Sequence, residues 1–167
     1  MKSIKLILLF IAVGFTPKHA AAQDVLMNIL TQNYGIINKT GIVFLEITVC
    51  NKSATIAMPA YKLRPQISFP ADLVSIPDTG HVLPPGWAIT FNTGSVIRLS
   101  NGTDQIPLQQ CRTILIAAKG VAVGGPSTIS GNLTFSNGIA PGTVPGSATP
   151  GDNPADNAST TTIKVTR

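Results

Sequence analysis

The residues best suited to chemistry lie in one short stretch, where an Asp-Thr-Gly tripeptide at 78–80 precedes His81. Asp-Thr-Gly is the tripeptide of aspartic proteases, in which two carboxylates must share a proton. The sequence holds one copy, so a homodimer would have to supply the second Asp78. Pro77 and Gly80 also suit a plain β-turn, because proline presets φ and glycine accepts a positive φ. We expect the turn and keep a dimeric aspartic protease as the less favoured alternative.

His81 is the one histidine after residue 22 and could in principle serve as a general base. However, the sequence has no Gly-x-Ser-x-Gly elbow, and no motif selects a serine partner for this histidine. We therefore expect an isolated surface histidine. No catalytic residue and no cofactor are predicted, and the chain is not expected to be an enzyme.

Cys50 and Cys111 are the two cysteines of the chain, and an even count in an exported protein favours a disulfide. Closing a loop of about 60 residues would stabilise the fold by roughly 4 kcal/mol in the chain-entropy model. Apolar residues alternate from Val43 to Val49, so Cys50 should face outward. The bond would then lie on an outer face or at a sheet end. Two free thiols are the alternative.

Asp152, Asn153, Asp156 and Asn157 offer oxygen ligands of the kind that Ca²⁺ uses. They lack the acidic spacing and the bidentate glutamate of an EF-hand. Asx side chains that bond to their own backbone explain the cluster without a metal. We predict no metal site and keep calcium at these four residues as a weaker alternative.

Trp87, which follows a Pro-Pro-Gly sequence at 84–86, is the best aromatic candidate for a platform on which a sugar could stack. Tryptophan is usually largely buried, so we favour a rim residue that covers one end of the core. A small carbohydrate-binding module that uses Trp87, with a glycan as partner, is the second function considered.

Net charge bears on the class of partner. The chain has 12 Lys and Arg against 7 Asp and Glu, or +5. Three basic residues, Lys2, Lys5 and Lys18, fall within the first 22, so 12 minus 3 leaves 9 basic against 7 acidic groups, or +2. Nucleic-acid binding needs a concentrated basic face, so no nucleic-acid partner is expected.

Residues 1–22 have the order of a cleaved signal peptide. Lys2 and Lys5 precede an apolar run at 6–15, and three alanines follow at 20–22. The apolar run is too short to span a bilayer. We expect cleavage after Ala22, a secreted or cell-surface protein, and no transmembrane segment once the signal is removed.

Residues 23–167 are expected to form one all-β domain that positions these side chains. The clearest strand is 41–51, where apolar residues occupy one face and Glu46 and Thr48 the other. Further strands are expected at 24–32, 63–69, 73–76, 88–92, 96–99, 112–119, 127–135 and 160–165. Short strands separated by turn residues favour a two-sheet antiparallel sandwich over a closed barrel.

Two segments interrupt this pattern. Pro65, Pro70 and Pro77 predict that residues 63–77 form an edge strand or a bulged crossover, because proline cannot donate to a ladder. Residues 136–157 are almost entirely Gly, Pro, Ala, Ser, Thr, Asn and Asp, which predicts a long flexible loop.

Three local patterns resemble the bacterial extracellular conserved-repeat domain known as domain of unknown function eleven. They are Val-Cys-Asn-Lys-Ser at 49–53, Leu-Pro-Pro-Gly-Trp at 83–87, and Gly-Asp-Asn-Pro-Ala-Asp-Asn at 151–157 before a Thr-rich strand. The resemblance implies an Ig-like sandwich similar to adhesin modules. We therefore expect a secreted, non-enzymatic domain with a structural, adhesion or surface-assembly role. Exposed sheet edges would mediate self-assembly or capture of a protein partner.

Overall fold

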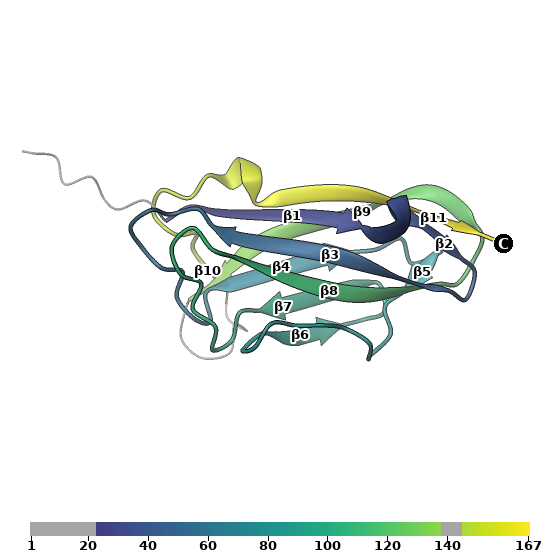
Figure 1. The fold of residues 1–167 in the computed structure, drawn as a ribbon, viewed down its shortest axis with the longest axis horizontal. Coiled ribbons are helices and arrows are strands. Elements are labelled where there is room, and N and C mark those ends of the chain that lie inside the picture. The colour runs from purple at the N-terminus through teal and green to yellow at the C-terminus, as the bar shows by residue number, and fades with distance from the viewer. Residues whose placement is uncertain (1–22, 138–144) are drawn as a thin grey trace, which may run out of the picture.

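The computed structural model describes residues 23–137 and 145–167. The predicted signal peptide, residues 1–22, and residues 138–144 of the predicted loop lie outside this range. Two β-sheets pack face to face, and the protein is an all-β, Ig-like sandwich as predicted (Figure 1). In the part of the chain that the structure covers, helices are short 3-10 turns, and none has the length and apolarity needed to cross a membrane.

The smaller sheet has four strands in the order β1 (Val25–Thr31), β3 (Ile42–Asn51), β8 (Cys111–Gly120) and β5 (Val74–Ser75). The larger sheet follows the order β2 (Ile36–Asn38), β11 (Ala158–Thr166), β9 (Gly124–Ser136), β4 (Leu63–Ser68), β7 (Val96–Ser100) and β6 (Ala88–Asn92), and β10 (Pro145–Gly146) pairs with β9. Each of the strands expected from the sequence is present, with small shifts at the ends.

The core lies between the two sheets and is built by the period-two alternation of their strands. In β3, the residues from Val43 to Val49 that were expected on one face are all buried. Ile114 and Ile116 of β8 and Ile97 of β7 are fully buried as well. Gly131 of β9 faces this core, and a Cβ there would come within 3.0 Å of Met27 Cε, so the missing side chain makes room for β1.

The first strand changes sheets, which the sequence did not predict. After β1 a 3-10 turn, η1 (Gln32–Gly35), leads into β2, which pairs in parallel with β11 of the other sheet. A Cβ on Gly35 would lie 2.2 Å from the carbonyl oxygen of Thr162, so only glycine fits this crossing. Among the described strands, all other pairs are antiparallel, and one isolated parallel bridge joins Lys39 to Gly120.

The prediction that residues 63–77 form an edge or crossover is right for β5 and wrong for β4. β5 lies at the edge of the smaller sheet, and the chain crosses between the sheets before it. β4 instead lies between β9 and β7. Pro65 is tolerated there because it pairs with Leu133 of β9, while the ladder to β7 begins only at Gln66.

The predicted flexible loop, 136–157, begins at the last residue of β9, and its described part after residue 144 is attached to the sandwich. It contains β10 and a 3-10 turn, η2 (Pro154–Asp156). Thr149 is buried and donates through Oγ1 to the carbonyl oxygen of Gln23 at 2.6 Å, and the N–H of Gln23 donates to the carbonyl oxygen of Pro150. Polar composition predicted a loop, but hydrogen bonds hold this loop to Gln23, just before β1.

Candidate functional site

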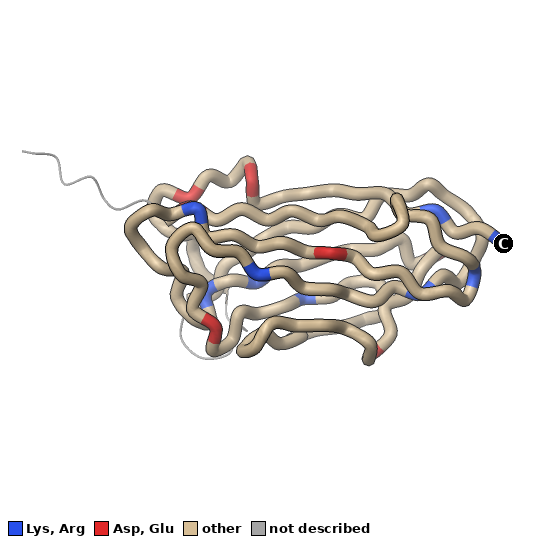
Figure 2. Tube along the Cα trace, viewed as in Figure 1, with Lys and Arg blue, Asp and Glu red and all other residues tan. Residues whose placement is uncertain are grey.

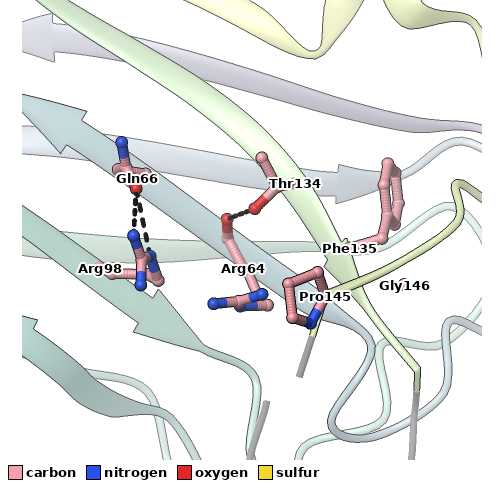
Figure 3. Close-up of a pocket in the computed structure, with 7 residues that line it drawn as sticks. All are labelled: Arg64, Gln66, Arg98, Thr134, Phe135, Pro145 and Gly146. Atoms are coloured by element: carbon pink, nitrogen blue, oxygen red, sulfur yellow. Dashed lines mark hydrogen bonds between the residues drawn. The ribbon is translucent and has the colours of Figure 1, made fainter. Parts of the chain in front are cut away.

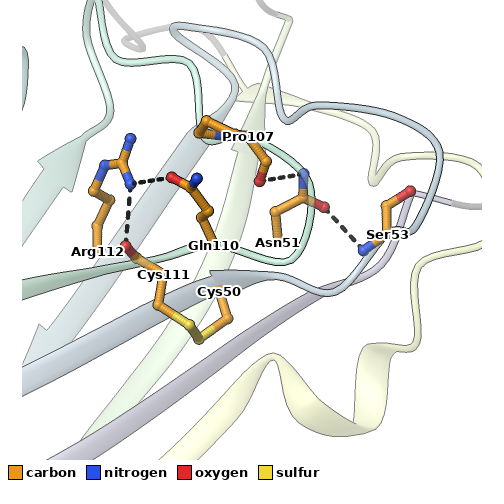
Figure 4. Close-up of a disulfide and its surroundings, with 7 residues drawn as sticks. All are labelled: Cys50, Asn51, Ser53, Pro107, Gln110, Cys111 and Arg112. Atoms are coloured by element: carbon orange, nitrogen blue, oxygen red, sulfur yellow. Dashed lines mark hydrogen bonds between the residues drawn. A yellow bond between two sulfur atoms is a disulfide. The ribbon is translucent and has the colours of Figure 1, made fainter.

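Cys50 and Cys111 form a disulfide, as predicted (Figure 4). They face each other across β3 and β8, in register and near one end of the smaller sheet. Cys111 is exposed and Cys50 is partly exposed, so the bond lies on the outer face rather than in the core. A disulfide of this kind fits an oxidising compartment.

Asn51, next to the disulfide, is a buried polar residue to which sequence reasoning gave no structural role. Its Nδ2 donates to the carbonyl oxygens of Ile56, Ile106 and Pro107, and its Oδ1 accepts from the N–H of Ser53. Figure 4 shows the bonds to Pro107 and Ser53. This one amide therefore links backbone groups of the loop that follows β3 to those of the loop that precedes β8. Asn51 is also the asparagine of the Val-Cys-Asn pattern, and this pattern is the feature of the sequence that could have indicated its structural role.

Asp78 and His81 do not form a catalytic pair. Asp78 is exposed in a bend before Gly80, which has a φ of +89°, as the turn interpretation requires. His81 Nδ1 accepts from the N–H of Ala117 at 3.1 Å, so the proton lies on Nε2, which donates to the carbonyl oxygen of Pro77 at 2.8 Å. The imidazole therefore ties the 77–82 segment to β8.

Trp87 is a core residue rather than an exposed platform. Its side chain is 6% exposed, and its indole N–H donates to Asp104 Oδ2 at 2.7 Å. Arg112 of β8 pairs with the same carboxylate. Stacking of a sugar needs an exposed ring face, so this placement favours the rim interpretation over the ligand-binding one.

The four candidate calcium ligands use much of their hydrogen-bonding capacity within the protein. Asp152 accepts from the N–H of Val25 and from Asn157 Nδ2, and Asn153 Oδ1 accepts from the N–H of Ala155. Asp156 Oδ2 pairs with Lys52 Nζ at 3.1 Å, which raises the pKa of Lys52. One oxygen each of Asp156 and Asn157 is buried without a partner. Within residues 23–137 and 145–167, no three His, Cys, Asp or Glu side chains gather as metal ligands would.

One edge of the sandwich, the free side of β1, is covered by side chains. β1 and β11 lie side by side although they belong to different sheets (Figure 1). The N–H of Ile29 donates to Ser159 Oγ at 3.1 Å, and the N–H of Val25 donates to Asp152 Oδ1 at 3.2 Å. Two backbone donors of β1 that another strand could otherwise pair with, those of Val25 and Ile29, are therefore occupied.

At the opposite edge, the described residues place no such cover on β6. β6 pairs with β7 on one side, and no strand in the described ranges pairs with its other side. Its sequence carries no charge, and Phe91 is 44% exposed. A register shift between Ile89 and Phe91 places a bulge at Thr90, which shortens the length available for pairing.

Beside β6, the outer face of the larger sheet carries a basic cavity of about 610 Å³ (Figure 3). Arg64 of β4 and Arg98 of β7 both line it. The other lining residues are Gln66, Thr134, Phe135, Pro145 and Gly146. The Arg98 guanidinium lies 5.3 Å from the ring centre of Phe91, so the cavity adjoins the free edge. Charged residues are sparse along the strands as a whole, as Figure 2 shows.

No protein-family model matches this sequence, and no curated protein is significantly similar to it. Solved structures share its fold. A cohesin module from a Clostridium perfringens family 33 glycoside hydrolase has a TM-score of 0.51 at 7% identity, covering 87% of this chain and 97% of that one. A chain from a complex of a CaDoc0917 variant with CaCohA2 has a TM-score of 0.51 at 10% identity, covering 85% and 99%.

BcpA, the major pilin subunit of Bacillus cereus, also has a TM-score of 0.51, at 10% identity. That match covers 86% of this chain and 41% of the pilin. At such identities the similarity concerns the fold alone.

Proposed function

We propose that this chain is a secreted, non-enzymatic β-sandwich domain that serves in structure, adhesion or assembly outside the cell, and that it meets its protein partner through β6. The observation that carries the proposal is the free side of β6, an uncharged edge strand with an exposed phenylalanine. An unpaired edge offers backbone donors and acceptors to another strand, which is the basis of β-augmentation.

Three further features support this function. The fold is shared with a cohesin module and a pilin subunit. The Cys50–Cys111 disulfide suits an exported protein, in keeping with the signal peptide predicted at residues 1–22. Asp78 lies in a turn and His81 holds backbone groups, so neither is arranged for acid–base chemistry. Membership of domain of unknown function eleven stays a prediction.

The simplest partner for β6 is a second copy of the same strand. β6 has five residues and a bulge, so pairing between two copies involves few hydrogen bonds and gives a weak association. Light scattering coupled to size-exclusion chromatography, over a series of protein concentrations, measures it. We expect the average mass of the wild-type protein to rise with concentration.

Phe91→Lys places a charge on this edge and should hold the protein at the monomer mass at all concentrations. Leu30→Lys is the matched control, because Leu30 is 55% exposed on β1, whose free side is covered. The control should associate like the wild-type protein. A wild-type mass that stays monomeric up to the solubility limit, or equal loss in both variants, would contradict self-pairing through β6.

A further inference from the structure

The basic cavity on the larger sheet holds two arginines, Arg64 and Arg98, that form no ion pair with an acidic side chain among the residues that the structure describes. Arg64 is 7% exposed, and its Nε is buried without a hydrogen bond. Arg98 Nε and Nη2 donate to Gln66 Oε1 at 3.1 and 2.7 Å, so this guanidinium is held by a neutral amide rather than by a carboxylate (Figure 3). Burial and the charge of Arg98 both lower the pKa of Arg64.

A buried cation without a counter-charge is costly, so its presence needs a reason. The surrounding strands supply none, because the strands of the larger sheet contain no aspartate and no glutamate in the described residues. Arg64, Arg98 and Lys164 are the charged side chains on these strands. The outer face of the larger sheet is therefore positive, and its strongest concentration of charge lies inside a concave site.

We propose that this cavity binds a carboxylate group, carried either by a small organic acid or by an acidic side chain of a protein partner. The guanidinium fork matches the planar carboxylate in two parallel hydrogen bonds. Gln66 already fixes the orientation of Arg98, so little side-chain freedom is lost on binding. The site acts in the monomer and does not require pairing through β6.

Isothermal titration of the protein at low ionic strength tests this proposal, with citrate and a hexaglutamate peptide as separate probes. We expect saturable binding that weakens as salt is added. Binding of both probes indicates a site open to free acids, and binding of the peptide alone indicates an acidic segment of a partner chain. Either result supports carboxylate recognition. Absence of saturable binding with both probes would overturn it.

Arg98→Gln should weaken binding by about tenfold or more, because a charge-assisted bidentate contact is lost. Arg98→Lys keeps the charge but loses the fork, and should also bind more weakly. Arg64→Gln is an independent test should Arg98 variants melt at a lower temperature. Equal affinity of the wild-type protein and both glutamine variants would contradict the assignment.

Lys164→Gln is the matched control. It removes one positive charge from the same face, but it lies near the end of β11 where Ile163 pairs with Ser127, far along β9 from Thr134 in the cavity. Its affinity should stay within about twofold of the wild-type value, because exposed charges at such distances are screened. The titrations are run below the concentration at which the protein associates through β6. Carboxylate binding and association through β6 are then measured separately, so one can fail without the other.

Discussion

β1 and β6 are both edge strands without a charged residue, yet the fold treats them differently. Backbone donors on the free side of β1 reach Asp152 and Ser159, which come from the far end of the chain. β6 has no comparable cover from any described strand. The hydrogen-bonding capacity of β1 therefore serves stability, whereas that of β6 is left for a partner.

The contrast depends on the C-terminal segment rather than on the edge sequences themselves. β11 crosses beside β1, and the turn before it supplies Asp152. Asp152 and Ser159 each provide one side-chain acceptor where a neighbouring strand would provide a carbonyl. Each can therefore be replaced without altering the core.

The largest effect is expected from the disulfide near the covered side, where Cys50 pairs with Leu26 of β1. Replacing both cysteines by alanine should lower the free energy of unfolding by about 4 kcal/mol, because the closed loop no longer restricts the unfolded chain. Urea unfolding of the double variant and of the wild-type protein measures this difference. Concentration-dependent association through β6 should persist, and its loss would show that the two edges are not independent.

Asp152→Ala should have the next largest effect. It leaves the N–H of Val25 and the Nδ2 of Asn157 without their acceptor, and we expect a loss of about 2 kcal/mol. Asp152→Asn keeps an acceptor oxygen and is the control, with a smaller expected loss. Equal stability of the alanine variant and the wild-type protein would mean that this carboxylate does not cover β1.

Ser159→Ala should cost about 1 kcal/mol, mainly because the N–H of Ile29 loses its acceptor. The exposed hydrogen bond that Ser159 Oγ donates to Asn28 Oδ1 is lost as well. Thr162→Ala, at an exposed position of the same strand, should change stability by less than about 0.5 kcal/mol. Thermal melts of the two variants compare them directly. A larger loss of stability for Thr162→Ala than for Ser159→Ala would contradict the idea that Ser159 stabilises the free side of β1.

Much of the fold could be predicted from the sequence, because period-two alternation and turn residues are local signals. The strand at 42–51 and the outward direction of Cys50 follow from that alternation. The sheet change between β1 and β2 could not be predicted, since it depends on the close approach of Gly35 to Thr162 from the other end of the chain. The position of β4 inside the larger sheet was missed for a related reason. Proline excludes one side of a strand, not both.

The candidate sites were harder to predict than the strands. Asp78 and His81 stand close together in the sequence and could have formed a catalytic site. In the structure Asp78 lies in a turn, and His81 holds backbone groups of the 77–82 segment and of β8. The arginines that do share a cavity, Arg64 and Arg98, are 34 positions apart, on strands whose adjacency no local pattern reveals. The sequence pattern that could have indicated this cavity is a lack of acidic residues. The segments that form the larger sheet have arginine and lysine but no acidic residue.

Hydrogen–deuterium exchange at low and high protein concentration tests the contrast between the two edges most directly. In the dilute protein, the amides of Val25 and Ile29 should exchange slowly because side chains cover them, and residues 88–92 should exchange faster. At high concentration, new protection should appear in β6 and not in β1. New protection confined to β1, or none in β6 when light scattering shows association, would contradict the assignment of β6 as the interacting edge.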